Sequence, residues 1–395
     1  MKILLILTSI EVGTIQKVSY NLYKALLTQK DVELYVVNLK SSEKDFYEFK
    51  NLYNIVECKS NNFFVHQVYN LRKVFKLFKI KLKIRPDISI TTQEAATTIN
   101  LLSLGSEKKI GIFHAPYYQA RSQGKIKFYL QFLSYKYLYL KLNELYCVSN
   151  EIKNSITDRF LLIDKSRLKV VYNIHDFDEI KIKSEEQLDV NEEFLFESKV
   201  IIYVGRFDHN KAPDRLIEAF YQLRSRKKIE SDIKLLFIGD GDKDYVVYLY
   251  DLVAKYGLND NVFFLGFKDN PYKYIKRSTL LVSSSFSEGL PGVVIESIFL
   301  KTPVVTTNSS LGLWEIFNCV DDYNRNLSDI YIADNGIITS NFENEEFTAN
   351  VVSNLGRGIE MFLTDEDFYQ KTKNRDFEFK YLLDKDYIVN NFVEI

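Results

Sequence analysis

The chain has 395 residues, of which 46% are hydrophobic and 27% charged, a balance that excludes a largely disordered protein. Its length exceeds the roughly 250–300 residues that one hydrophobic core serves, so we expect two domains. Three widely spaced cysteines exclude a Cys-x-x-Cys metal or redox motif and favour a reducing compartment, the cytoplasm.

Short apolar runs alternate with amphipathic stretches along residues 1–175, which predicts a parallel sheet with crossover helices. Strands are predicted at 3–7, 32–39, 87–91, 109–113, 144–148 and 168–171. Helices are predicted at 16–27, 70–84 and 125–142. The first of these strands follows directly on Met1, and its apolar run is too short for a secretory signal.

The charged stretch 176–195 is predicted to be a linker, after which the same alternation restarts over residues 196–375. Strands are predicted at 200–204, 234–238, 262–265, 280–284 and 304–306. Helices are predicted at 213–223, 245–256, 292–300 and 376–393. The fold class is therefore α/β, with two Rossmann-like domains.

Charge is divided unevenly between the two predicted domains. Residues 1–180 hold 27 Lys and Arg against 17 Asp and Glu, whereas the remainder holds 25 against 36. The basic first half favours an anionic partner, such as a phospholipid surface or a lipid-linked phosphate acceptor. Within it, the predicted helix 70–84 interleaves cations with apolar residues and is a candidate for contact with an anionic membrane.

The segment from Ser287 to Glu296 is the strongest candidate site. It follows the predicted strand 280–284 and opens a helix, so it lies where open α/β sheets bind ligands. The free N–H groups of a helix start suit a phosphate. Five residues between Glu288 and Glu296 are expected to contact the phosphate-bearing ligand: Gly289, Leu290, Pro291, Gly292 and Val293.

Glu288 and Glu296 stand eight residues apart, and the segment resembles the E-x7-E motif of family 4 retaining glycosyltransferases. The surroundings are similar as well. The stretches that match the family are 204–211 (VGRFDHNK), 236–241 (LFIGDG), 264–267 (FLGF) and 302–305 (TPVV). The resemblance is strong over residues 198–315 and weaker over the N-terminal half.

Arg206 and Lys211 follow a predicted strand and can stabilise a departing diphosphate, because two fixed cations beside a helix start form an anion site. The resemblance implies that Glu288 orients the donor sugar as a catalytic residue. It also implies that Glu296 accepts hydrogen bonds from ribose and that Phe267 borders the base.

In the first domain, Gly13 opens a predicted helix where the family usually has two adjacent glycines, and Val12 replaces the first of them. His114 ends the strand 109–113 and resembles the histidine that reaches the donor sugar, so we expect it to be catalytic. The stretch 173–176 resembles a hinge motif, with Ile174 in place of glycine.

The resemblance implies a GT-B fold, in which two parallel-sheet domains face each other across a cleft. Domain 1–175 would bind the acceptor, domain 196–375 the nucleotide sugar, and the helix within 376–395 would cross back to the first domain. The activity implied is retaining transfer of a hexose or N-acetylhexosamine from a UDP-sugar to a glycan or lipid-linked hydroxyl in polysaccharide, O-antigen or capsule biosynthesis.

No resident cofactor, metal or nucleic-acid partner is expected, because the Asp-x-Asp pairs lack the setting of a metal site. The protein would be cytoplasmic, or peripheral at the inner face of the membrane. Two alternatives stay open: a nucleotide-sugar 2-epimerase of similar fold, and a non-catalytic partner subunit. A dinucleotide oxidoreductase would need G-x-G-x-x-G after the first strand, where Gly13 stands alone. The stretch 319–334 is an insertion without an assigned role.

Overall fold

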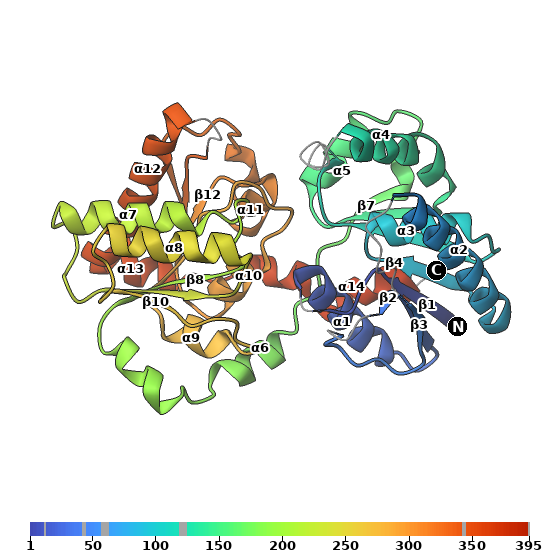
Figure 1. Ribbon diagram of the computed structural model, residues 1–395, viewed down its shortest axis with the longest axis horizontal. Coiled ribbons are helices and arrows are strands. Elements are labelled where there is room, and N and C mark those ends of the chain that lie inside the picture. The colour runs from blue at the N-terminus through green and yellow to red at the C-terminus, as the bar shows by residue number, and fades with distance from the viewer. Residues whose placement is uncertain (12, 42–44, 57–62, 118–124, 342–344, 394–395) are drawn as a thin grey trace. The chain divides into compact units, whose positions relative to one another are not determined.

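The chain folds into two compact units, shown in the computed structural model of Figure 1. The structure describes residues 1–11, 13–41, 45–56, 63–117, 125–341 and 345–393. The first unit holds Met1–His175 together with Tyr381–Ile395, and the second holds Asp176–Lys380. Each unit is a sheet of parallel strands, with one antiparallel edge strand in the second unit, and helices flank it as the alternation of apolar strands and amphipathic helices predicts.

The first unit contains a seven-stranded sheet in the order β3-β2-β1-β4-β5-β6-β7, with every pairing parallel. Its strands are β1 (Lys2–Leu7), β2 (Glu33–Ser41), β3 (Leu52–Val56), β4 (Ile88–Thr91), β5 (Lys108–Phe113), β6 (Glu144–Cys147) and β7 (Leu168–Val170). Its helices are α1 (Thr14–Leu27), α2 (Phe63–Ile84), α3 (Glu94–Leu102), α4 (Lys125–Leu133), α5 (Asn150–Thr157) and α14 (Lys385–Val393). The central strands are buried on both faces, which explains their continuous apolar sequences.

The second unit repeats this architecture in the order β10-β9-β8-β11-β12-β14-β13. Its strands are β8 (Val200–Val204), β9 (Lys234–Ile238), β10 (Val262–Phe264), β11 (Leu280–Ser283), β12 (Val304–Thr307), β13 (Ile330–Ala333) and β14 (Gly336–Thr339). Its helices are α6 (Phe177–Ser184), α7 (Pro213–Ser225), α8 (Lys243–Lys255), α9 (Tyr272–Arg277), α10 (Gly292–Phe299), α11 (Leu311–Ile316), α12 (Glu345–Thr364) and α13 (Glu366–Lys373). The core between sheet and helices includes the buried side chains of Leu216, Phe220, Phe237 and Ile359.

The stretch 176–195, expected as a linker, is folded onto the second unit. It forms α6 and most of a 3₁₀ helix at Val190–Phe196, and α6 packs against α9. Its acidic residues have partners there: Glu192 accepts hydrogen bonds from Lys268 (2.7 Å) and Tyr274 (2.6 Å). Part of the charge that suggested a solvated linker is therefore paired with residues in and just before α9.

The chain returns to the first unit through α14. The helix predicted at 376–393 is divided, with a 3₁₀ segment at Glu378–Leu383 and α14 after it. Phe392 of α14 packs with its ring centre 5.1 Å from that of Tyr146, and the Tyr146 hydroxyl donates to the Asn391 carbonyl oxygen (2.6 Å). The inserted stretch 319–334 supplies β13, which pairs antiparallel with β14 and closes one edge of the second sheet.

Candidate functional site

The order of strands in the second sheet reverses between β8 and β11. The chain leaves β8 toward β9 on one side and leaves β11 toward β12 on the other, so the loops after these two strands diverge. Such a switch point at the carboxyl ends of parallel strands is where α/β sheets bind ligands. The segments 205–212 and 284–291 both lie at this edge.

These two segments are joined by an ion pair between Lys211 and Glu288, whose Nζ and Oε1 atoms lie 2.5 Å apart. Both side chains are largely shielded from solvent, with exposed fractions of 21% and 13%. Backbone contacts hold the same segments together, because Phe286 N donates to Asn210 O (2.7 Å) and Asn210 Nδ2 donates to Ser287 O (2.9 Å). The two predicted residues are thus brought together on a fixed frame.

Arg206 lies at the solvent side of the same loop. Its side chain is 74% exposed and its guanidinium lies 3.1 Å from Asp208, whose carboxylate also accepts a hydrogen bond from the Lys211 backbone N–H (2.9 Å). The buried Tyr203 hydroxyl donates to Arg206 O (2.9 Å) and fixes the backbone below the arginine. Burial and the carboxylates of Asp208 and Glu288 raise the pKa of Tyr203 well above its usual value, so this phenol keeps its proton.

The helix start after Glu288 is built by α10. Pro291 is the N-cap of α10, and the backbone N–H groups of Val294 and Ile295 donate to its carbonyl oxygen at 3.2 and 3.4 Å. The N–H groups of Gly292 and Val293 therefore belong to the helix end that suits an anion. Leu290 is buried and anchors the turn.

The backbone of α11 approaches the turn at Gly289 closely. A Cβ added at Gly312 in α11 would lie 2.3 Å from the Gly289 carbonyl oxygen, so only glycine fits there. The neighbouring Ser309 carbonyl accepts a hydrogen bond from the Glu288 backbone N–H (3.1 Å). The segment 288–292 is therefore held by α11 as well as by the loop after β8.

Glu296 is buried in α10, where 7% of it is exposed. The Tyr272 hydroxyl of α9 lies 3.4 Å from its Oε1 and orients the carboxylate. Phe267 is half exposed and follows the turn at Gly266, whose carbonyl accepts a hydrogen bond from Gly239 N (2.9 Å). Gly239 itself has φ +145, and a Cβ there would meet Gly205 O at 1.8 Å, so the loops after β8, β9 and β10 lie against one another.

A buried arginine that the sequence does not mark supports the loop before Glu288. The Arg215 guanidinium in α7 lies 3.6 Å from the centre of the Phe286 ring and donates to Asn341 Oδ1 (2.9 Å). Asn341 Nδ2 in turn donates to Phe286 O (2.8 Å). Arg215 is only 3% exposed, so this cation is part of the interior frame of the site.

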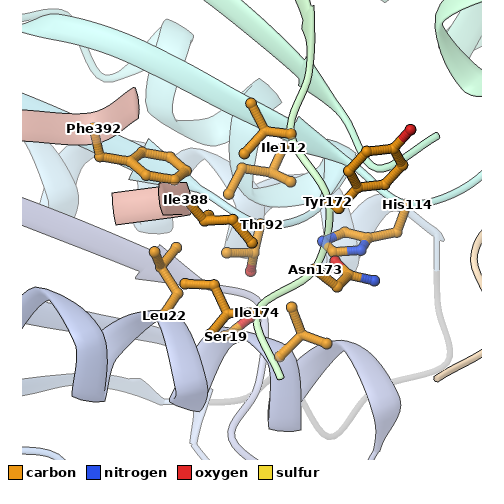
Figure 2. A pocket seen from close by; sticks show the side chains of 12 residues that line it. Ser19, Leu22, Thr92, Ile112, His114, Tyr172, Asn173, Ile174, Ile388 and Phe392 are labelled. Carbon is orange, nitrogen blue, oxygen red and sulfur yellow. The ribbon is translucent and has the colours of Figure 1, made fainter. Parts of the chain in front are cut away.

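His114 and Gly13 lie in the first unit, at the carboxyl edge of its sheet. His114 lines a small cavity of about 20 Å³, large enough for one water molecule, whose other walls include Asn173, Thr92 and, from α14, Phe392 (Figure 2). His114 Nε2 and Asn173 Oδ1 are buried without a hydrogen-bond partner among the described residues. Burial lowers the pKa of His114 to about 4, so its ring is neutral at ordinary pH.

Gly13 precedes α1, and its carbonyl accepts a hydrogen bond from Lys17 N (2.9 Å). Its φ of 169° is extended backbone, which any residue adopts. A Cβ there would meet only the flexible end of Gln16, at 2.3 Å. The local backbone therefore does not demand glycine at this position.

The expected site residues thus form two sets, one in each unit. In the second unit, Lys211 and Glu288 are in direct contact, whereas Arg206 pairs with Asp208 and Glu296 lies beside Tyr272. The residues that sequence reasoning missed are Tyr203, Arg215, Ser309, Gly312 and Asn341. In the part of the chain that the structure describes, no three His, Cys, Asp or Glu side chains gather as a metal site. No helix among the described residues is long and apolar enough to cross a bilayer.

Two α/β units of this architecture are the components of the GT-B fold. Residues 185–335 match the family model described as Glycosyl transferases group 1. This segment, which holds the candidate site, is therefore similar to the group 1 glycosyltransferases, which are family 4. The expected resemblance to that family and the expected fold are confirmed.

Relatives of known sequence and structure agree with this assignment. The chain is 29% identical over 285 residues to an uncharacterized glycosyltransferase of Methanocaldococcus jannaschii, covering 70% of this chain and 68% of that one. It is 32% identical over 156 residues to a Campylobacter jejuni diphospho-undecaprenol N-acetylgalactosaminyltransferase, covering 39% of each. The structure of Anabaena HepE with UDP and glucose superposes with a TM-score of 0.75 at 14% identity, covering 100% of this chain and 98% of that one.

Proposed function

We propose that this glycosyltransferase moves a hexose or N-acetylhexosamine from a UDP-sugar to a hydroxyl of a glycan or lipid-linked acceptor, with retention of configuration and without a metal ion. The observation that carries the proposal is the Lys211–Glu288 pair beside the start of α10. The cation and the free N–H groups of the helix start suit the negative diphosphate of a nucleotide sugar. The carboxylate beside them suits the sugar hydroxyls, so the set fits a sugar diphosphate better than a neutral ligand.

The donor diphosphate would lie on the start of α10, at the N–H groups of Gly292 and Val293. Lys211 and Arg206 would stabilise the charge that develops on the leaving phosphate as the bond to the anomeric carbon breaks. Arg206 is suited to this role because its exposed guanidinium can reach solvent-side phosphate oxygens. Glu296, buried and oriented by Tyr272, would accept hydrogen bonds from the ribose hydroxyls.

Glu288 would orient the sugar and stabilise positive charge at the anomeric carbon. The acceptor oxygen attacks that carbon on the face from which UDP departs, and its proton passes to the departing phosphate oxygen. One C–O bond forms and one breaks on the same face of the anomeric carbon, and configuration is therefore retained without a covalent enzyme intermediate. His114, neutral because its pKa is about 4, would donate or accept a hydrogen bond at a sugar hydroxyl.

The choice of UDP and of a lipid-linked acceptor has support from the relatives. HepE was solved with UDP and with UDP-glucose, and the Campylobacter relative transfers N-acetylgalactosamine to a diphospho-undecaprenol glycan. Polysaccharide, lipopolysaccharide or capsule biosynthesis is the setting that such an acceptor implies. The described cysteines Cys147 and Cys319 are both free thiols, which agrees with a cytoplasmic location.

The proposal is tested by thermal-shift measurements with UDP, GDP, ADP and their sugars, followed by detection of nucleotide release from the donor that binds. A ligand at 100 times its Kd stabilises the protein by about 2.7 kcal/mol, which a melting curve resolves. We expect UDP to raise the melting temperature most, and UDP release to require an acceptor glycan. A 2-epimerase would instead alter the sugar without an acceptor. Absence of binding by every nucleotide would refute the proposal.

A further inference from the structure

The inserted stretch 319–334, which we call the insertion, packs on helices α11 and α12 of the second unit. Trp314 of α11 is fully buried, and the centre of its ring lies 5.6 Å from that of Tyr323 in the insertion. From α12, Asn354 Nδ2 donates a hydrogen bond to the Ser328 carbonyl oxygen (3.0 Å). Contacts with two helices therefore hold the insertion in a defined place.

The side chain of Asn308, in the loop after β12, joins the insertion to α11. Its Nδ2 donates to the carbonyl oxygens of Asn324 (2.8 Å) and Arg325 (3.3 Å). Its Oδ1 accepts a hydrogen bond from Trp314 Nε1 (2.8 Å). An exchange of the amide oxygen and nitrogen would set oxygen against two carbonyls and a donor against the indole N–H. The three bonds therefore fix the orientation of this amide.

The residue after Asn308 contacts the candidate site. The Ser309 carbonyl oxygen accepts the hydrogen bond from the Glu288 backbone N–H (3.1 Å). A second bond links the same two loops one turn below, because Thr307 Oγ1 donates to the Ser285 carbonyl oxygen (2.6 Å). The loop after β12 therefore lies along the loop that carries Glu288.

We propose that Asn308 is a positioning residue for Glu288 and that the insertion is the support for Asn308. The inference rests on the proposed function, in which Glu288 orients the donor sugar. The insertion fixes the Asn308 amide, the amide fixes the backbone at 308–309, and the Ser309 carbonyl fixes the backbone of Glu288. Asn308 itself touches no substrate in this arrangement. The ion pair with Lys211 holds the Glu288 side chain, whereas these contacts hold its main chain.

Asn261 offers a matched comparison within the same unit. Its Nδ2 also donates to two backbone carbonyls, those of Ser231 (3.0 Å) and Ile233 (3.1 Å). It directly precedes β10, so it lies at the amino ends of the parallel strands, whereas the candidate site lies at their carboxyl ends. Replacement by Asp sets a carboxylate against two carbonyl oxygens at either position and should cost stability in both. A difference in turnover between the two variants then reflects where the amide lies.

The first test compares Asn308→Asp with Asn261→Asp. We expect Asn308→Asp to lower kcat about tenfold to hundredfold, as a small displacement of a reacting group does, with the Kd for UDP within about twofold of wild type. UDP binding is spared because UDP carries no sugar for Glu288 to orient. Asn261→Asp should lower the melting temperature as Asn308→Asp does and keep the wild-type kcat. Steady-state kinetics, calorimetry and melting curves measure these quantities.

The second test changes an exposed side chain of the insertion, so that loss of folding does not obscure the result. Asn324 Oδ1 accepts a hydrogen bond from the Asn326 backbone N–H (3.0 Å) and shapes the turn that presents the two carbonyls to Asn308. Asn324→Ala removes this acceptor, whereas Asn324→Asp keeps it. We expect Asn324→Ala to lower kcat about threefold or more, and Asn324→Asp to turn over as wild type. Both should keep the wild-type melting temperature.

Hydrogen exchange of the segment 286–292, followed by mass spectrometry, measures the coupling without any substrate. Exchange should be faster in Asn308→Asp and Asn324→Ala than in wild type, and unchanged in Asn261→Asp. The proposal is overturned if Asn308→Asp has the kcat of Asn261→Asp. It is also overturned if Asn324→Ala keeps both the kcat and the exchange of wild type. Absence of turnover by wild-type protein would count against the proposed function, and the exchange measurement would then decide the inference.

Discussion

Lys211 Nζ lies 2.5 Å from Glu288 Oε1, although the two residues follow different strands and stand 77 positions apart in the chain. The pair ties the loop after β8 to the loop after β11. In the proposed reaction, each partner has a second task, since Lys211 faces the leaving phosphate and Glu288 the donor sugar. The ion pair therefore holds both groups in place before the donor binds.

Replacement of Glu288 by Gln should separate catalysis from nucleotide binding. We expect kcat to fall about 100-fold or more, because the carboxylate that faces developing positive charge is lost. UDP binding should be unchanged or tighter, because Lys211 no longer has an internal carboxylate beside it. Steady-state kinetics and calorimetry measure the two effects. The control Glu360→Gln removes a carboxylate from an ion pair with Lys228 (3.1 Å) and should leave kcat as in wild type. Wild-type turnover by Glu288→Gln would contradict the assigned role.

Replacement of Arg206 by Ala should affect the ligand and not the fold. The side chain is 74% exposed, and exposed ion pairs such as that with Asp208 contribute little stability. We expect the melting temperature without ligand to stay at its wild-type value. The Kd for UDP should rise about tenfold to hundredfold, as expected for a charged hydrogen bond to phosphate. Arg226→Ala, at another exposed position, is the control, and equal UDP affinity in both variants would remove Arg206 from the site.

Replacement of Arg215 by Met should destabilise the second unit. The change removes the cation against the Phe286 ring and leaves Asn341 Oδ1 without this buried donor, which together cost about 2–4 kcal/mol. Trp314 is the single tryptophan of the chain and lies in this unit, so urea unfolding followed by its fluorescence reports the unit directly. Arg226→Met should unfold as wild type. A variant Arg215→Met with the wild-type midpoint would show that the network does not support the loop.

His114 should make the stability of the first unit depend on pH. Its pKa in the folded protein is about 4, below the usual 6.5, so between these values the unfolded chain binds the proton more readily. The free energy of unfolding should therefore fall as pH falls from about 6.5 toward 4, by as much as about 3 kcal/mol. Unfolding followed by circular dichroism at several pH values, with His114→Gln as the comparison, measures this contribution. An equal pH dependence in both proteins would be inconsistent with a neutral buried imidazole.

Much of the fold follows from local patterns in the sequence. The runs that form β1 and β8 are continuous and apolar because strands at the centre of a parallel sheet are buried on both faces. By contrast, the sequence patterns do not predict β3, β13 or β14. The first two lie at sheet edges, where the apolar signal is weak, and β14 is buried but only four residues long and begins with glycine. The stretch 176–195 was assigned to a linker because its charges suggested solvation, whereas the cations and hydroxyls of the 268–276 region pair with them.

The candidate site could be predicted only in part. Residues such as Glu288 and Glu296 lie within one short motif, so their spacing is visible in the sequence. The contact of Arg215 with Phe286 depends on how α7 packs beneath the loop after β11, and nothing in the neighbouring sequence marks that arginine. The same holds for Gly312, whose need for glycine arises from a carbonyl 23 positions away in the chain.

The return of α14 to the first unit has a consequence for how the chain acquires its structure during synthesis. Residues 176–380 form an uninterrupted unit, so the second unit can fold as soon as its own last strand and helices have left the ribosome. The first unit, although its sheet is made earlier, has to wait for Phe392 to cover Tyr146. The half of the protein that is translated first is therefore the half that is completed last, and until then the surface that α14 covers remains open.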